Sequence, residues 1–173
     1  MRLAKWASRL APVALTVLLG MALAGCANQV PNPSANLIGD GSNDPNGPVT
    51  PGSSRDFTVN VGNIVYFTTD STDLTPDAQN TLRSQASWLG KYPQYTITLE
   101  GHADERGTRE YNLALGAKRS ETVRTFLASQ GVTAARVRTI SFGKERPVAV
   151  CNDISCWSQN RRVVTVLNQR AGT

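Results

Sequence analysis

From residue 57 onward, segments rich in β-branched and aromatic residues alternate with segments of helical periodicity, and this order constrains the fold more than any other feature. Strands are expected at residues 57–67, 96–99, 137–142 and 163–167. Helical segments separate the first three strands, and no helix is predicted before the fourth. The order βαβαββ predicts an α+β fold, a two-layer sandwich in which two main helices cover one face of a mixed four-stranded sheet.

Both predicted helices carry start and stop signals. Thr75-Pro76-Asp77 supplies a capping hydroxyl, a proline at the first helical position and an acid in the first turn. Gly90 is expected to end this helix. Thr108 is expected to cap a longer helix that runs to about Gln130, with Gly131 just beyond its end.

The N-terminal residues 1–25 have the pattern of an export signal, with three basic residues followed by an apolar run at 10–24. That run is shorter than the roughly 20 residues that a membrane-spanning helix needs. The segment Leu23-Ala24-Gly25-Cys26 resembles a bacterial lipobox, which implies cleavage before Cys26 and a lipid on that cysteine. Ala27, which stands where some lipoproteins have aspartate, implies transport to the outer membrane. The alternative is an ordinary secretory signal with a chance cysteine.

Residues 26–55 are predicted to be the lipidated cysteine and a flexible tether. The segment 27–55 is crowded with Pro, Gly, Ser and Asn and shows no apolar period. A coil of this length spans about 30 Å. We therefore expect a folded domain at residues 56–173 that can reach away from a membrane surface.

The net charge of +5 gives little support for nucleic-acid binding. Three of the 18 basic residues lie in the export signal, which leaves 15 basic and 13 acidic residues, or about +2. In an oxidising compartment, Cys151 and Cys156 are expected to form a disulfide, and two free buried thiols are the alternative.

Arg119 is the most unusual residue of the second predicted helix. It falls near the centre of an apolar stripe formed by Leu115, Val123, Phe126 and Leu127. A buried guanidinium needs an anion, either an internal carboxylate or the carboxylate of a ligand, whereas a side chain that reaches solvent needs neither. The loop 101–107 follows a predicted strand, which places Asp104 at the carboxyl end of the sheet, where ligands commonly bind.

Four segments together resemble the OmpA-type domain of the peptidoglycan-associated lipoproteins: Gly101-His102-Ala103-Asp104-Glu105-Arg106-Gly107, Tyr111-Asn112-Leu113-Ala114-Leu115-Gly116, Arg119-Ser120 and Asn160-Arg161-Arg162-Val163. The resemblance covers roughly residues 60–167. It implies that Asp104 binds the ammonium group and Arg119 the carboxylate of diaminopimelate in peptidoglycan stem peptides.

The resemblance also supplies secondary candidates for the ligand site, namely Phe67, Asp70, His102, Leu113 and Arg162. The family's first-strand motif is Tyr-Phe-Asp, an apolar residue and Asp, whereas here Phe67 precedes Thr68-Thr69-Asp70. Asp70 matches this motif and Thr68 departs from it, so a ligand role for the side chain at position 68 is not carried over. Of the adjacent arginines 161 and 162, whose side chains point to opposite faces of a strand, Arg162 is the one we expect to line the pocket. A solvated or structurally paired side chain is the alternative.

The expected function is noncovalent anchoring of the outer membrane to peptidoglycan, without enzyme activity or cofactor. The resemblance implies the Tol-Pal system of envelope integrity and cell division as its setting, with TolB as a partner. One alternative is a metal-assisted cell-wall hydrolase built on His102, Asp104 and Glu105, although the chain has no other histidine. Another is a protein-binding envelope tether in which Asp104 and Arg119 form an internal salt bridge.

Overall fold

The computed structural model describes residues 49–169. The predicted signal, Cys26 and most of the predicted tether lie outside the described residues, so cleavage and lipidation stay predictions. Among residues 49–169, no helix is long and apolar enough to cross a membrane. The elements are, in chain order, α1 (Ser54–Asp56), the π-helical segment η1 (Phe57–Val61), β1 (Ile64–Tyr66), α2 (Pro76–Lys91), β2 (Tyr95–His102), α3 (Arg109–Ser129), the short 3-10 helix η2 (Ala134–Arg136), β3 (Val137–Gly143), α4 (Ile154–Asn160) and β4 (Arg162–Gln169).

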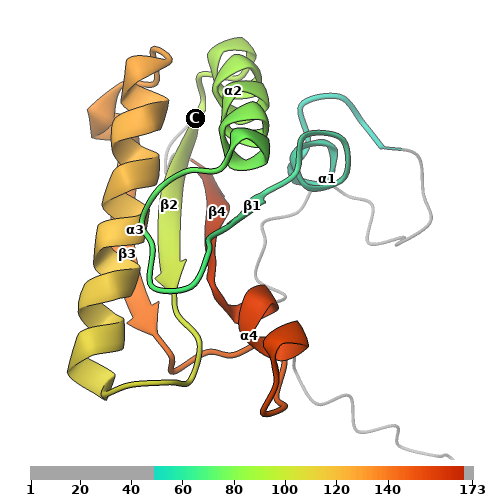
Figure 1. The fold of residues 1–173 in the computed structure, drawn as a ribbon. Coiled ribbons are helices and arrows are strands. Elements are labelled where there is room, and N and C mark those ends of the chain that lie inside the picture. Colours follow the sequence, from blue (N-terminus) through green and yellow to red (C-terminus); the bar gives the residue numbers. More distant parts are fainter. Residues whose placement is uncertain (1–48, 170–173) are drawn as a thin grey trace, which may run out of the picture. The chain divides into compact units, whose positions relative to one another are not determined.

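The four strands form one mixed sheet in the order β1-β4-β2-β3 (Figure 1). β4 is antiparallel to both of its neighbours, whereas β2 and β3 are parallel. The carboxyl ends of β1, β2 and β3 therefore meet at the same edge of the sheet, where β4 begins. This edge carries the candidate site.

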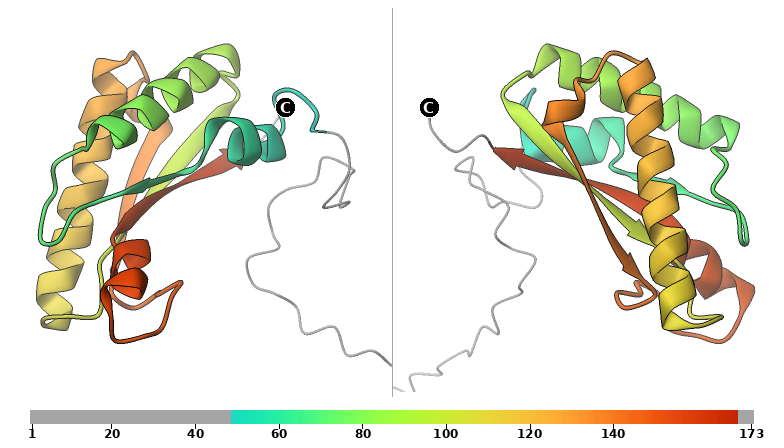
Figure 2. Two further views of the ribbon diagram at one scale, coloured as in Figure 1. Left: turned by 45° about the vertical axis from the view of Figure 1, so that its right-hand side comes forward. Right: turned by 90° about the vertical axis from the view of Figure 1, so that its left-hand side faces the viewer.

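Helices α2 and α3 cover one face of the sheet, as predicted (Figure 2). Between helices and sheet lies the apolar core, which includes Val65, Leu82, Leu89, Ile97, Leu99, Val123, Leu127 and Val163. The hydroxyl of Thr75 accepts a hydrogen bond from the Ala78 N–H at 3.2 Å, and Thr108 caps α3 in the same way. The mixed four-stranded sheet and the two main helices of the predicted α+β fold are confirmed.

The first predicted strand was too long, because residues 57–61 are helical and β1 has only three residues. The helical turn buries Phe57, whose ring lies 4.9 Å from that of Trp88 on α2. It also brings the Asp56 carboxylate to the Trp88 indole N–H at 2.8 Å. These contacts with α2 outweigh the local β propensity of Val59 and Val61. The prediction that Gly90 ends α2 was also wrong, although by one residue only.

The predicted order βαβαββ missed α4, which lies between β3 and β4. This helix has only seven residues, too few for an apolar period to be visible. Asp153 caps its N-terminus, and the Asp153 carboxylate accepts a hydrogen bond from the Ser155 N–H at 2.8 Å. The predicted disulfide between Cys151 and Cys156 is confirmed, and it ties the start of α4 to the preceding loop.

Reduction of this disulfide is expected to lower the free energy of unfolding by about 2 kcal/mol, because the bond closes a loop of only six residues. Chemical denaturation with and without a reductant measures the difference. The variant Cys151→Ala/Cys156→Ala is the control, and its stability should not respond to the reductant. A loss well above 2 kcal/mol would show that α4 contributes more to the fold than a local loop does.

Two glycines allow α3 to lie directly on β2. A Cβ atom on Gly101 would lie 1.9 Å from the carbonyl oxygen of Gly116, and a Cβ atom on Gly116 would lie 2.4 Å from the Ser141 hydroxyl. The Ser141 hydroxyl also joins the helix to the sheet, because it donates a hydrogen bond to the Leu113 carbonyl oxygen at 2.7 Å. The close approach brings Arg119, almost one turn after Gly116, to the carboxyl edge of the sheet.

Candidate ligand-binding site at the carboxyl edge of the sheet

A pocket of about 290 Å³ opens at this edge, between the loop after β1, the loop after β2 and the first turns of α3. Its walls are formed by Thr69, Asp70, Asp104, Arg106, Gly107, Tyr111, Asn112, Leu115 and Arg119. Asp104 and Arg119, the two principal residues predicted from the sequence, thus line one pocket. Loops supply the acidic groups and α3 supplies the buried cation.

Arg119 is fully buried and is held by backbone carbonyl oxygens. Its Nε donates to Ser71 at 2.9 Å, its Nη1 to His102 at 2.9 Å and its Nη2 to Thr68 at 3.2 Å. The ring of Phe67 lies beneath the guanidinium, with its centroid 5.2 Å from Cζ. A guanidinium has five N–H groups, so one N–H on each of Nη1 and Nη2 has no acceptor among residues 49–169.

Arg119 makes no ion pair with any carboxylate of the described residues 49–169. The internal salt bridge between Asp104 and Arg119, one of the alternatives from the sequence, is therefore absent. Burial, with a smaller contribution from Arg161, lowers the pKa of Arg119 to about 10. The side chain stays charged at neutral pH, and its two remaining N–H groups suit the two oxygens of a carboxylate.

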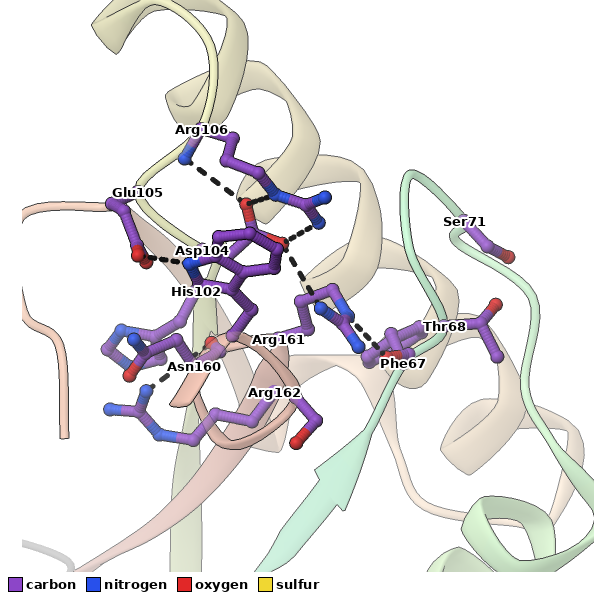
Figure 3. Close-up of polar contacts among 12 residues, drawn as sticks. Phe67, Thr68, Ser71, His102, Asp104, Glu105, Arg106, Asn160, Arg161 and Arg162 are labelled. Atoms are coloured by element: carbon purple, nitrogen blue, oxygen red, sulfur yellow. Dashed lines mark hydrogen bonds and ion pairs between the residues drawn. The ribbon is translucent and has the colours of Figure 1, made fainter. Parts of the chain in front are cut away.

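Asp104 is almost fully buried and is surrounded by donors. Arg106 binds it through two side-chain N–H groups, Nε at 3.1 Å and Nη2 at 2.7 Å, and through its backbone N–H at 3.2 Å. Arg161 adds a fourth hydrogen bond at 3.2 Å. Burial alone would raise the pKa of Asp104, but the hydrogen bonds from Arg106 and Arg161 outweigh it and hold the pKa below its ordinary value. Figure 3 shows both arginines directed at this carboxylate.

The prediction that Arg162 lines the pocket was wrong, because neither Arg161 nor Arg162 belongs to the pocket wall; of the two, Arg161 reaches the site through its hydrogen bond to Asp104. Arg161 follows α4 and links Asp104 to the Phe67 carbonyl oxygen, which accepts from its Nε at 3.1 Å. Arg162 lies on the opposite face of β4 and donates to the carbonyl oxygens of Asn160 and Arg146. Alternation along the strand predicts that the two side chains diverge, but it does not tell which one faces Asp104.

Of the secondary candidates near β1 and α3, only Asp70 lines the pocket. Phe67 contacts Arg119 and Arg161, as described, but does not line the pocket. Position 68 supplies a carbonyl oxygen to Arg119, a role that does not depend on its side chain. Asp70 lines the pocket, has a left-handed backbone (φ 54°) and accepts a hydrogen bond from the Tyr111 hydroxyl. Leu113 lies outside the pocket wall.

The His102 side chain points away from the pocket, although its carbonyl oxygen binds Arg119. It is buried on the sheet face opposite α2 and α3 and packs against Phe142. Among residues 49–169 neither ring nitrogen has a hydrogen-bond partner, and Glu100 Oε2 lies 4.0 Å from Nε2. Burial, and then the charges of Arg162 and Arg146, lower the pKa of His102 to about 3. No group of three or more His, Cys, Asp and Glu side chains within residues 49–169 could hold a metal ion. The metal site expected for a hydrolase is thus not formed by His102, Asp104 and Glu105.

His102→Phe is expected to make the protein less sensitive to acid. The folded-state pKa of about 3 lies below the ordinary value of 6.5, so between these values the unfolded chain binds the extra proton. Stability is then fully present above pH 6.5 and falls by about 1.4 kcal/mol for each pH unit until about pH 3. Urea denaturation from pH 7 to pH 4 measures this slope. An equal slope in the variant would mean that another group carries the acid sensitivity.

Three residues of the site were not singled out from the sequence: Arg106, Arg161 and Trp157. The Trp157 indole N–H donates to the Glu105 carboxylate, and its ring lies 4.2 Å from the Arg106 Cζ. The only local signal was the two-residue spacing from Asp104 to Arg106, which suits a turn closed by the aspartate side chain. The contacts of Arg161 and Trp157 depend on α4, which the sequence did not predict.

Comparison with known proteins assigns the chain to a family. Residues 66–161 of the chain match the OmpA family. The chain belongs to the OmpA family. Among its relatives, the peptidoglycan-associated lipoprotein of Agrobacterium fabrum is 63% identical over 158 residues, which are 90% of this chain and 87% of that protein. The peptidoglycan-associated lipoprotein of Pseudomonas aeruginosa is 42% identical, over 84% of this chain and 90% of that protein.

Two solved structures have a similar fold. The crystal structure of the peptidoglycan-associated lipoprotein from Burkholderia pseudomallei matches with a TM-score of 0.60 and 45% identity, over 61% of this chain and 90% of that chain. The C-terminal domain of MotB from Helicobacter pylori matches with a TM-score of 0.56 and 22% identity, over 62% of this chain and 86% of that chain. At that identity the second match shows a shared fold alone.

Proposed function

We propose that this OmpA-family protein holds the outer membrane to peptidoglycan by noncovalent binding of diaminopimelate. The observation that carries the proposal is that Asp104 and Arg119 line one pocket without pairing with each other, and that two N–H groups of Arg119 remain for a ligand carboxylate. The names of the relatives, which are peptidoglycan-associated lipoproteins, support the same reading. No bond is made or broken, so the protein acts by recognition and not by catalysis.

The free end of diaminopimelate in a stem peptide carries an ammonium group and a carboxylate on one carbon atom. Arg119 forms a forked pair with the carboxylate, and Asp104 accepts from the ammonium. The two opposite charges of the pocket fix the orientation of this zwitterion. A ligand that lacks the carboxylate leaves the buried Arg119 without a counter-ion, and one that lacks the ammonium forgoes its ion pair with Asp104, which makes recognition selective.

The lipid that the lipobox implies on Cys26 anchors the protein in the outer membrane, and the predicted tether lets the domain reach the wall. The folded domain begins earlier than predicted, because the Gly52 carbonyl oxygen accepts from the Tyr95 hydroxyl and Ser53 is buried. The setting of the protein is the Tol-Pal system, with TolB as a partner. This part of the proposal rests on the family and on the pattern of residues 23–55.

Cosedimentation with purified peptidoglycan sacculi tests the proposal. We expect the unmodified protein to pellet with the sacculi, free diaminopimelate to release it, and folded Asp104→Ala and Arg119→Ala variants to stay in solution. If the unmodified protein stays soluble, or if all three folded proteins pellet alike, the assigned pocket is wrong. Pelleting that diaminopimelate does not affect would favour an envelope tether that works through protein partners.

A further inference from the structure

The carboxylate of Asp104 is already saturated in the absence of a ligand. An ionised carboxylate offers about four acceptor positions. Oδ1 accepts from the Arg106 backbone N–H and Nε, and Oδ2 accepts from Arg106 Nη2 and Arg161 Nη1. An incoming ammonium group therefore cannot simply add to this site, and one of the present donors must leave.

The Arg106 guanidinium is the donor that can leave. The side chain of Arg161 is only 7% exposed and is also fixed by the Phe67 carbonyl oxygen. The Arg106 backbone N–H is part of the turn that presents Asp104. In contrast, the Arg106 side chain is 42% exposed and supplies two of the four hydrogen bonds. Its departure frees one position on each carboxylate oxygen.

Trp157 provides a place for the displaced guanidinium. The Arg106 Cζ already lies 4.2 Å from the centroid of the indole ring, a distance typical of a cation on an aromatic face. The ring itself is held, because its N–H donates to Glu105 and because the Cys151–Cys156 disulfide closes the start of α4. Arg106 can thus leave Asp104 without losing contact with Trp157.

We propose that Arg106 occupies the ammonium subsite and that the ligand ammonium displaces it from Asp104, while its contact with Trp157 is kept. Arg106 is then a residue that determines specificity: it competes for Asp104 with every ligand cation, and a ligand without an ammonium group leaves it in place. This inference rests on the proposed function. It makes Arg106 a competitor of the ligand ammonium for Asp104.

Calorimetric titration of the full chain in detergent with two matched peptides tests the inference. One is a stem tripeptide that ends in diaminopimelate, and the other ends in 2-aminopimelate, which lacks the ammonium group at its free end. Arg106→Gln is expected to bind the first peptide about three- to tenfold more tightly than the unmodified chain does, because an internal ion pair no longer competes. Its affinity for the second peptide should stay the same. Arg106→Lys keeps a competing cation and should show a smaller gain.

The outcomes separate this inference from the proposed function. Weaker or unchanged binding of the diaminopimelate peptide by Arg106→Gln would overturn the inference while leaving the function intact. A gain of equal size for both peptides would also overturn it, because competition for the ammonium subsite predicts a gain for one peptide only. If the unmodified chain binds neither peptide, the proposed function fails and the inference falls with it. As an independent readout, the Arg106 Nε–H resonance in NMR should shift on addition of the first peptide and not of the second.

Discussion

Arg119→Ala is expected to abolish binding to sacculi and to lower the free energy of unfolding by at least about 3 kcal/mol. The carbonyl oxygens of Ser71, Thr68 and His102 would lose their donor in a buried place, at about 1–3 kcal/mol for each unsatisfied group. Binding would be lost because the ligand carboxylate would have no counter-ion. Urea denaturation measures the first effect, and cosedimentation of the folded fraction measures the second.

Two further variants separate charge from structure in this prediction. Arg119→Lys keeps a buried cation but lacks the planar fork, so we expect it to fold and to bind sacculi at least about tenfold more weakly. Arg124→Ala removes a partly exposed arginine of the same helix, which pairs with Glu121 at 3.3 Å, and should change stability by less than about 0.5 kcal/mol. A folded Arg119→Ala protein that still pellets would exclude this residue from the site.

Asp104→Asn is expected to reduce binding to sacculi by a factor of about 100 or more, because the ligand ammonium would lose the buried carboxylate that accepts from it. The same change leaves the buried Arg161 without its counter-ion and should cost about 3 kcal/mol of stability at neutral pH. Quantitative pelleting and urea denaturation measure the two effects. Asp73→Asn, an exposed acid on the loop after β1, is the matched control and should change neither.

The stability difference between the unmodified protein and Asp104→Asn should itself depend on pH. Hydrogen bonds from Arg106 and Arg161 hold the pKa of Asp104 below its ordinary value of 3.8. The stabilisation is therefore fully present above pH 3.8 and is lost as the pH falls through the lower folded-state value. The two proteins should converge in stability below pH 3.8. A difference that persists unchanged in strong acid would show that Asp104 acts through packing and not through its charge.

Local patterns predicted those elements whose ends are signalled within a few residues. The Thr75-Pro76 start of α2 and the Thr108 start of α3 could be read from capping chemistry, since the cap bonds the same chain two or three residues further on. The prediction of a strand at 57–61 was wrong. These residues have β propensity, but the helical turn lets Phe57 pack on Trp88, and this contact stabilises the helical conformation more. Helix α4 was missed because a helix of seven residues has too few positions for periodicity.

The sequence by itself determined the class of fold from the order of its periodic segments, and the disulfide partners from an even pair of cysteines in an oxidising compartment. It singled out Asp104 and Arg119, which line the pocket, through their places in a loop and on a helix and through the resemblance to a family. Only the tertiary structure decided which other side chains surround Asp104. The choice of Arg161 over Arg162, and the contact between Arg106 and Trp157, depend on how β4 and α4 meet the edge of β2. These contacts join residues about 50 positions apart, and no local pattern records which of two neighbouring side chains will face the other element.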